Sequence, residues 1–318
     1  MNREQVFSYK VRNTIQSILL LGGMASLLIL VGWLMAGMIG VWIAVVGGVL
    51  LAAGQRVSPQ MIFRMSQARL LTPAEAPVLL RLVHLLSQRA ELPVTPRVYY
   101  IPSAMMNAFT VGQPDNAAIG VTDGLLRRLN QRELAGVIAH EISHITHRDT
   151  WVMGLADVVS RMTSSWAMVG QILLLISVPT LLLSSYSPPW MLILVLLSAP
   201  TLSALLQLAL SRTREFDADL EAARLTGDPE GLASALATLE SDQRGFLRRL
   251  FLPGHRRSDA SVLRSHPPTQ ERIDRLRNLK GAQPTPRHAP VPAAGFIPRA
   301  TQDLPVARIP RWQLSGVV

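Results

Sequence analysis

The chain has 318 residues, of which 49% are hydrophobic, and a formal net charge of +10. This basic excess, with a mean hydropathy of +0.27, is typical of a membrane protein with basic cytoplasmic faces. The absence of cysteine excludes disulfides and cysteine-based metal or nucleophile chemistry. No recognised nucleic-acid motif is present, so we expect no nucleic-acid partner.

The first apolar segment lies between Arg12 and Arg56 and contains no charged residue. A membrane-spanning helix needs about 20 residues. The segment therefore predicts two transmembrane helices, residues 15–35 and 39–51, joined by a short turn at residues 36–37. It is too long for the apolar part of a signal peptide. Basic residues flank both outer ends, so the positive-inside rule predicts that both ends lie in the cytoplasm.

A more polar stretch follows, with signals for one amphipathic helix and a small sheet. Residues 72–75 (Thr-Pro-Ala-Glu) read as a capping box with proline at the first helical position, and apolar residues follow at helical spacing. Residues 97–101, 108–111 and 117–122 read as short strands, with a turn at 113–116. We expect a largely antiparallel sheet.

The sequence His140-Glu141-Ile142-Ser143-His144 follows a predicted helix start, an N-cap at Asn130 with a capping box completed by Glu133. Residues four apart share one face of a helix, so His140 and His144 point at one spot and can hold a zinc ion. Glu141 can take a proton from a water at the ion's open position. This is the arrangement of metalloproteases; the alternative is a surface helix with two solvated histidines.

The same helix is expected to continue through Arg148 and Asp149, whose charges place it in water or at a membrane surface. His147 lies on nearly the same face as His144. We expect it to be a polar helix residue and not a ligand, since catalytic zinc takes three protein ligands.

A second charge-free segment, residues 162–211, predicts another hairpin with helices at 166–183 and 190–210. A polar, proline-containing interruption at 184–189 separates them. Arginines beyond both ends again place the ends in the cytoplasm. Polar residues and a proline inside the segment leave open that these are long core helices of a soluble domain; they are Gln171, Pro200, Ser203 and Gln207.

Glu215, just after this hairpin, can supply the third zinc ligand from a second helix. Asp219, one turn on, can accept the outer N–H of a ligand histidine. A straight helix from His144 to residue 161 would extend about 25 Å. We therefore expect a break between residues 149 and 162, at Gly154, or a hairpin that leaves the bilayer near Pro200.

Four features together resemble the HtpX family of membrane-bound zinc endopeptidases, which is related to the CAAX prenyl proteases. They are the two hairpins, the His140–His144 motif, residues 211–219 (Ser-Arg-Thr-Arg-Glu-Phe-Asp-Ala-Asp) and residues 265–273 (Ser-His-Pro-Pro-Thr-Gln-Glu-Arg-Ile). The resemblance covers most of residues 1 to about 280. It implies zinc ligands at His140, His144 and Glu215, a catalytic acid at Glu141 and a substrate-binding edge strand at Asn107. Phe216 stands where the family often has tyrosine.

His266 and Arg272 are candidates to donate to the oxyanion that forms on the attacked carbonyl. The alternative is a proline-ended loop before a basic amphipathic helix. Residues 281–318 are rich in proline, alanine and arginine and are expected to form a disordered tail.

The sequence thus predicts a mainly α integral membrane protein with a small β-sheet, in which a zincin-like catalytic domain is combined with two apolar helical hairpins. The expected parts are a transmembrane hairpin (1–54), a first catalytic part with the motif helix (55–161), a second hairpin (162–211), a second catalytic part (212–280) and the tail (281–318).

The predicted activity is hydrolysis of peptide bonds by one Zn²⁺ per chain, with polypeptide substrates and a lipid bilayer as partners. The resemblance implies cleavage of misfolded membrane proteins in the bacterial inner membrane, with the catalytic domain and both termini in the cytoplasm. The alternatives are an intramembrane metalloprotease and a non-catalytic scaffold with a structural zinc closed by a fourth ligand. The sequence carries no signal for the oligomeric state.

Overall fold

The computed structural model describes residues 3–54, 59–183, 189–250 and 269–280. His266, the predicted tail and most of the interruption at 184–189 lie outside these residues. The described chain is mostly helical with one small sheet. It forms two compact units, which we call the hairpin unit (3–54, 148–183 and 189–220) and the sheet unit (59–147, 221–250 and 269–280).

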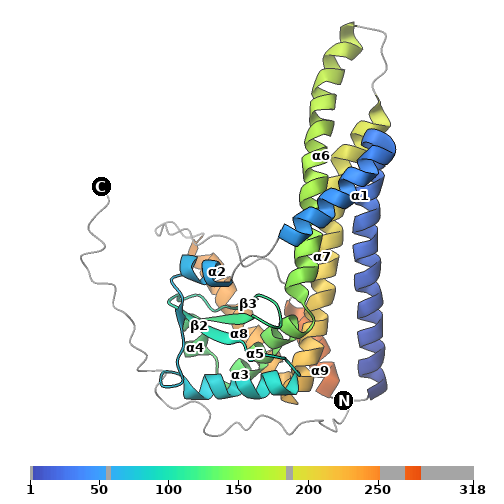
Figure 1. The fold of residues 1–318 in the computed structure, drawn as a ribbon. Coiled ribbons are helices and arrows are strands. Elements are labelled where there is room, and N and C mark those ends of the chain that lie inside the picture. The colour runs from blue at the N-terminus through green and yellow to red at the C-terminus, as the bar shows by residue number, and fades with distance from the viewer. Residues whose placement is uncertain (1–2, 55–58, 184–188, 251–268, 281–318) are drawn as a thin grey trace, which may run out of the picture. The chain divides into compact units, whose positions relative to one another are not determined.

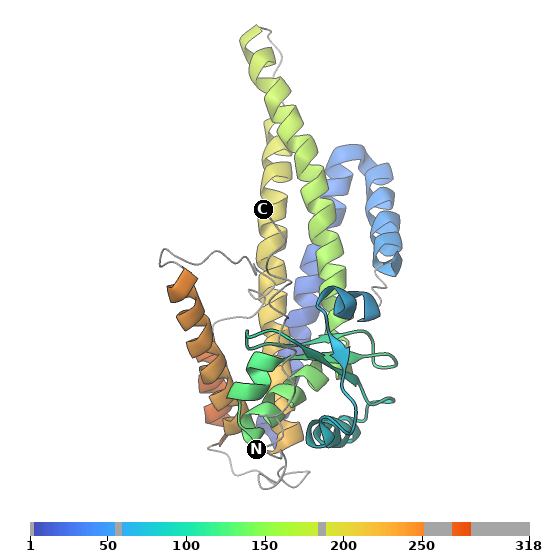
Figure 2. The same cartoon turned by 90° about the vertical axis from the view of Figure 1, so that its left-hand side faces the viewer.

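In the hairpin unit, α1 (Arg3–Gly54) is interrupted by non-helical backbone at Ala36 and Gly37. This break confirms the predicted turn, and Figure 2 shows the chain reversing direction there. Gly37 has φ +58°, a conformation that favours glycine. The arms touch at two further glycines, since a Cβ at Gly40 would lie 1.9 Å from the Gly32 carbonyl oxygen.

Two long helices complete the hairpin unit, α6 (Asp149–Leu183) and α7 (Trp190–Thr226), and they run side by side in Figure 1. The last turn of α7, from Glu221 onward, belongs to the sheet unit. Apolar side chains of all three helices form one buried cluster, which includes Met24, Leu28, Ala156, Val159 and Leu210. Ser160 on α6 also hydrogen-bonds with Ser203 (3.0 Å) and donates to Gln207 (2.7 Å) on α7.

The outer faces of these helices are apolar. Large hydrophobic side chains are exposed along each of them, among them Ile18 (63%), Trp42 (63%), Leu175 (74%) and Leu208 (63%). Core helices of a soluble domain would bury these side chains, so that alternative is wrong for α6 and α7. By length and composition, α1, α6 and α7 are each able to cross a membrane.

A buried polar network joins the three helices. Asn13 on α1 donates from Nδ2 to Asp217 Oδ1 at 2.7 Å. Arg214 on α7 donates from Nε to Asp149 Oδ1 at 2.6 Å and from Nη1 to Asp217 Oδ2 at 3.3 Å. Asn13, Asp149 and Asp217 are all less than 8% exposed. Each of these buried carboxylates therefore has a charged or amide donor.

The sheet unit is built on four strands in the order β1-β2-β4-β3. These are β1 (Arg69–Leu70), β2 (Arg97–Ile101), β3 (Ala108–Val111) and β4 (Ala118–Thr122). β1 pairs antiparallel with β2, and β3 pairs antiparallel with β4. β2 and β4 are parallel, because the hairpin turn after β3 inserts β4 between β2 and β3. The sheet is therefore mixed, with β3 at one edge, and β1 was not predicted.

Successive side chains of each strand point to opposite faces of the sheet, as pleated geometry requires. Val98, Tyr100, Ile119 and Val121 belong to the main core. On the other face Phe63, from α2 (Pro59–Met65), stacks on Tyr99 and Phe109 with centroid distances of 4.2 Å and 5.6 Å. Phe109 thus packs on the face of the sheet opposite the main core, while Ala108 and Thr110, its neighbours on β3, lie on the core face.

Helix α3 (Pro77–Arg89) begins later than predicted. Thr72 and Glu75 do form the expected turn, with the Thr72 backbone N–H donating to the Glu75 carboxylate at 3.0 Å. That bond is the largest cause of a lowered Glu75 pKa. The helix begins at Pro77 and not earlier, because a residue that precedes proline disfavours the α conformation. Ala76, which precedes Pro77, accordingly has a non-helical φ of −139°.

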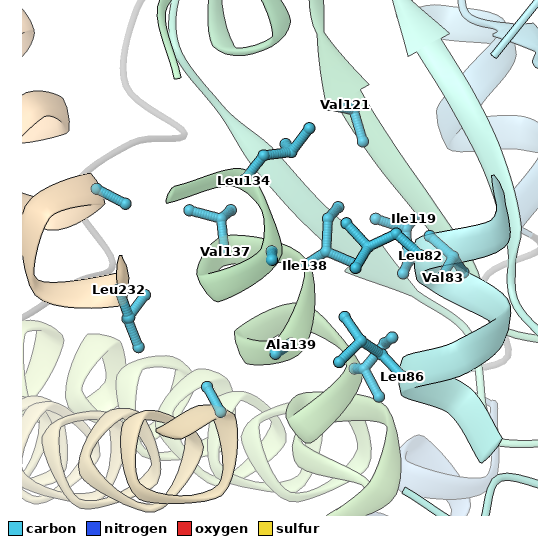
Figure 3. Close-up of a cluster of buried hydrophobic side chains, with 14 of the residues drawn as sticks. Leu82, Val83, Leu86, Ile119, Val121, Leu134, Val137, Ile138, Ala139 and Leu232 are labelled. Atoms are coloured by element: carbon cyan, nitrogen blue, oxygen red, sulfur yellow. The ribbon is translucent and has the colours of Figure 1, made fainter. Parts of the chain in front are cut away.

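The remaining helices of the sheet unit are α4 (Asp123–Arg128), α5 (Gln131–Thr146), α8 (Pro229–Leu250) and α9 (Thr269–Lys280). Helix α5 is central and is buried along most of its length. Figure 3 shows Leu134 and Ile138 of α5 directed toward Val121 of β4 and Leu82 of α3, while Val137 faces Leu232 of α8. The motif helix therefore packs against the sheet, α3 and α8 at once.

The predicted continuation of the motif helix through Asp149, with a break at Gly154, is wrong. Helix α5 ends at Thr146, Arg148 adopts a left-handed conformation (φ +54°), and α6 begins at Asp149. Asp149 can start a new helix because an acidic residue in the first turn is stabilised by the helix dipole. Helix α6 then passes through Gly154, and α7 through Pro200, as single helices.

Candidate metal centre

The start of α5 sets the register of the His140–His144 motif. Asn130 accepts from the backbone N–H groups of Arg132 and Glu133, and Glu133 accepts from the Asn130 N–H, which completes the predicted capping box. Glu133 is also anchored by Ser234 of α8, whose hydroxyl donates to Oε1 at 2.6 Å. These hydrogen bonds fix the first turn of α5, and so they fix the direction in which the two histidines leave the helix.

The two imidazoles meet as the four-residue spacing predicts. His140 Nε2 and His144 Nε2 lie 3.1 Å apart, and the rings are edge to face with centroids 4.7 Å apart. Two ring nitrogens on a tetrahedral zinc are separated by about 3.3 Å, given Zn–N bonds of about 2.0–2.1 Å. The pair thus has the spacing of two ligands of one ion.

Glu215 on α7, in the hairpin unit, is the third member of the predicted ligand group. His140 and Glu215 are both 5% exposed. Two imidazole nitrogens and one carboxylate oxygen are a donor set suited to zinc, with room for a fourth, non-protein ligand. These residues fit the metal that the sequence predicts.

Glu141 lies beside the pair and is 6% exposed. Its Oε2 accepts a hydrogen bond from the Thr110 hydroxyl at 2.8 Å. The same hydroxyl lies 3.2 Å from the Glu141 backbone oxygen. Thr110 was not predicted from the sequence, because its contact with α5 depends on the strand register. The only local signal was its position in a predicted strand.

Arg272, on α9, is 3% exposed and places Nη2 at 3.5 Å from His140 Nε2. A buried guanidinium at this distance from His140 can donate a hydrogen bond to a negatively charged oxygen that forms beside the histidine pair. The other oxyanion candidate, His266, lies outside the described residues.

Asn107 immediately precedes β3, and its backbone is held by Thr122. The Asn107 N–H donates to Thr122 Oγ1 at 2.9 Å, and the Thr122 hydroxyl donates back to the Asn107 carbonyl at 2.8 Å. Thr122 is also the N-cap of α4. The start of the edge strand is thereby tied to β4 and α4.

His147 is the C-cap of α5, and its Nδ1 lies 3.2 Å from the Ser143 hydroxyl. It does not belong to the ligand group found among the described residues. Asp219 is buried (4% exposed) one helical turn after Glu215 on α7.

The chain is similar in sequence to known proteins. Residues 73–280 match the model of Peptidase family M48. A Protease HtpX homolog of Acaryochloris marina is 41% identical over 238 residues, covering 70% of this chain and 79% of that protein. Another, of Desulfatibacillum aliphaticivorans, is 35% identical over 304 residues, covering 87% and 92%.

Among solved structures, the crystal structure of S. mikatae Ste24p is similar, with a TM-score of 0.47 and 19% identity over 85% of this chain and 66% of that one. This last likeness is too distant to bear on function. The family match and the two sequence relatives, together with the apolar helices α1, α6 and α7, show that the chain belongs to peptidase family M48, among the HtpX proteases, and is a membrane metalloprotease.

Proposed function

We propose that the chain is a zinc endopeptidase anchored in the bacterial inner membrane, which cleaves misfolded or membrane proteins on the cytoplasmic side. The observation that carries the proposal is the meeting of His140 Nε2 and His144 Nε2 at 3.1 Å, next to the buried carboxylate of Glu141. The relatives' printed name, Protease HtpX homolog, supports the same activity.

We assign one zinc ion per chain to His140, His144 and Glu215, with Asp219 as a carboxylate that orients a ligand histidine. When bound there, zinc supplies a Lewis acid that polarises the scissile carbonyl and makes water more acidic. Glu215 suits the third position because its carboxylate offers a hard oxygen that balances part of the ion's charge.

Glu141 is the proposed acid and base. It accepts a proton as a water oxygen bonds to the carbonyl carbon, and it gives that proton to the amine nitrogen as the C–N bond breaks. Arg272, buried near His140, is the proposed donor to the oxygen that gains negative charge.

Substrate binding is proposed along β3, which lies at the edge of the sheet, starting near Asn107. An extended peptide can add there as a further strand, with its backbone held by the ladder and its side chains on alternate faces. Polypeptides without stable structure present such strands most readily.

The proposal is tested with the purified full-length protein in detergent and casein as substrate. A zinc chelator should abolish cleavage, and returning zinc should restore it. Cleavage that persists at full rate after zinc has been removed, as checked by metal analysis, would contradict the assignment.

A further inference from the structure

Thr110 is the residue of the edge strand that reaches the Glu141 carboxylate. It lies in β3 opposite Ile119 of β4, so the strand ladder fixes its backbone. Its hydroxyl is 2.8 Å from Glu141 Oε2 and 3.2 Å from the Glu141 backbone oxygen. Both acceptors belong to Glu141. The Thr110 hydroxyl has a single proton to donate, and the carboxylate oxygen Oε2 is the nearer acceptor.

We propose that Thr110 is a positioning residue that orients the carboxylate of Glu141 for proton transfer. The inference deepens the proposed function and rests on it, because it presumes that Glu141 is the acid and base. Thr110 itself is not proposed to touch the reacting atoms.

The physical need for such a residue follows from the freedom of a glutamate side chain. Three torsions separate its carboxylate from the backbone, and the terminal one is broad, so packing alone leaves the direction of the two oxygens poorly defined. A hydroxyl that donates to one oxygen of an ionised carboxylate makes a charge-assisted bond, which is stronger than a neutral one. Holding Oε2 in this way defines where the other oxygen points.

The strand that carries Thr110 is itself held firmly. Phe109, the preceding residue, points to the opposite face and stacks on Phe63 at 5.6 Å. Gly120, opposite Phe109 on β4, leaves room for this stack, since a Cβ there would lie 2.9 Å from Phe63 Cε1 and 3.0 Å from Phe109 Cζ. The pairing with β4 and the stacking of Phe109 therefore fix the position of Thr110 next to Glu141.

Because β3 is also the proposed edge for substrate, one strand would align the peptide and orient the proton acceptor. Accurate placement of such groups is worth large factors in rate, and displacements of about 1 Å are felt. Loss of the hydroxyl should therefore lower the rate of the chemical step while leaving the affinity for substrate nearly unchanged.

The test compares Thr110→Val, which keeps the shape and removes the hydroxyl, with Thr110→Ser, which restores it. Thr95→Val is the matched control, since Thr95 is exposed and its hydroxyl contacts His84 at 3.1 Å. For each variant, kcat and KM are measured on a quenched fluorescent peptide that the wild type cleaves, with zinc content measured on the same samples.

Thr110→Val should lower kcat about 10-fold to 100-fold, the range for losing a hydrogen bond to a charged group, with KM and zinc content unchanged. Thr110→Ser should recover most of kcat, and Thr95→Val should match the wild type. If Thr110→Val fails to fold, Thr110→Ala takes its place with the same expectation.

The inference is overturned if the valine or alanine variant keeps the wild-type kcat, if its loss falls on KM alone, or if serine does not rescue. A failure of the proposed function has another signature, since the wild type would then show no zinc-dependent cleavage at all. An inactive Glu141→Gln beside a fully active Thr110→Val would reject the role of Thr110 and leave that of Glu141 intact.

Discussion

At the scale of single residues, the candidate centre combines donors of different origin. His140 and His144 come together through helical spacing alone, whereas the proposed third ligand, Glu215, belongs to α7 in the other unit. His140 and Glu215 are both 5% exposed, and His144 is half-buried. Burial of such groups is costly unless they are paired or bind an ion.

Replacement of Glu215 by alanine tests its proposed place among the ligands. The variant leaves two histidines to hold the ion in competition with water, so zinc content and proteolysis should fall together. Metal analysis after dialysis, alongside casein digestion, checks this, with Glu221→Ala on the same helix as the control. Full zinc occupancy in Glu215→Ala would remove Glu215 from the ligand set.

The sequence predicted the contacts that follow from local spacing but missed the contact of Thr110 with Glu141. The meeting of His140 and His144 and the capping box at Asn130 follow from helix geometry, and both are present. The approach of Thr110 to Glu141 joins residues 31 positions apart and depends on how β3 crosses α5. Periodicity within one element carries no information on such a contact.

At the scale of elements, the apolar helices of the hairpin unit are joined by polar contacts. Asn13 on α1 donates to Asp217 on α7, and Arg214 links the same carboxylate to Asp149 at the start of α6. In an apolar surrounding each of these groups must find its partner inside the protein. The network therefore fixes α1 and α7 relative to the start of α6.

Asn13→Leu should destabilise the hairpin unit, because it removes a buried donor from Asp217. Such a loss costs about 1–3 kcal/mol of unfolding free energy. Thermal unfolding of the purified protein in detergent should show a lower midpoint than for the wild type. Gln16→Leu, an equivalent change at an exposed position of α1, is the control and should leave the midpoint unchanged.

Element types were predictable, and their ends were less so. The strands 97–101 and 108–111 have the predicted limits, and the third begins one residue later, at Ala118. The start of α3 depended on Pro77 overriding an earlier capping box, and the end of α5 on a left-handed Arg148. Both are decided by the backbone conformation of one residue, which hydrophobic patterns do not reveal. The strand β1 has only two residues, too few to show alternation.

At the scale of the whole molecule, the distribution of charge along the chain bears on the proposed topology. No charged residue occurs in residues 13–55 or 162–211, and basic residues flank both segments. The positive-inside rule then favours cytoplasmic locations for residues 1–12, 55–161 and 212–318. The exposed apolar faces of α1, α6 and α7 supply the surface that the bilayer would cover.

Reporter fusions in bacteria test this topology. Fusions at Ala36 and at Ser187 should report the periplasmic side, and a fusion at Arg127, in the sheet unit, should report the cytoplasm. A cytoplasmic signal at Ser187 would mean that the second hairpin does not cross the membrane.

Zinc content and peptide turnover, measured on one preparation of Glu141→Gln, show whether Glu141 performs acid and base chemistry beside a zinc ion held by other residues. Glutamine keeps the size of the side chain and can still accept from Thr110, but it cannot carry the proton. Zinc should remain near one equivalent per chain while kcat falls about 10²-fold to 10⁴-fold, the usual worth of a positioned acid or base. A Glu141→Gln protein that binds zinc and cleaves at the wild-type rate would show that Glu141 is neither the acid nor the base.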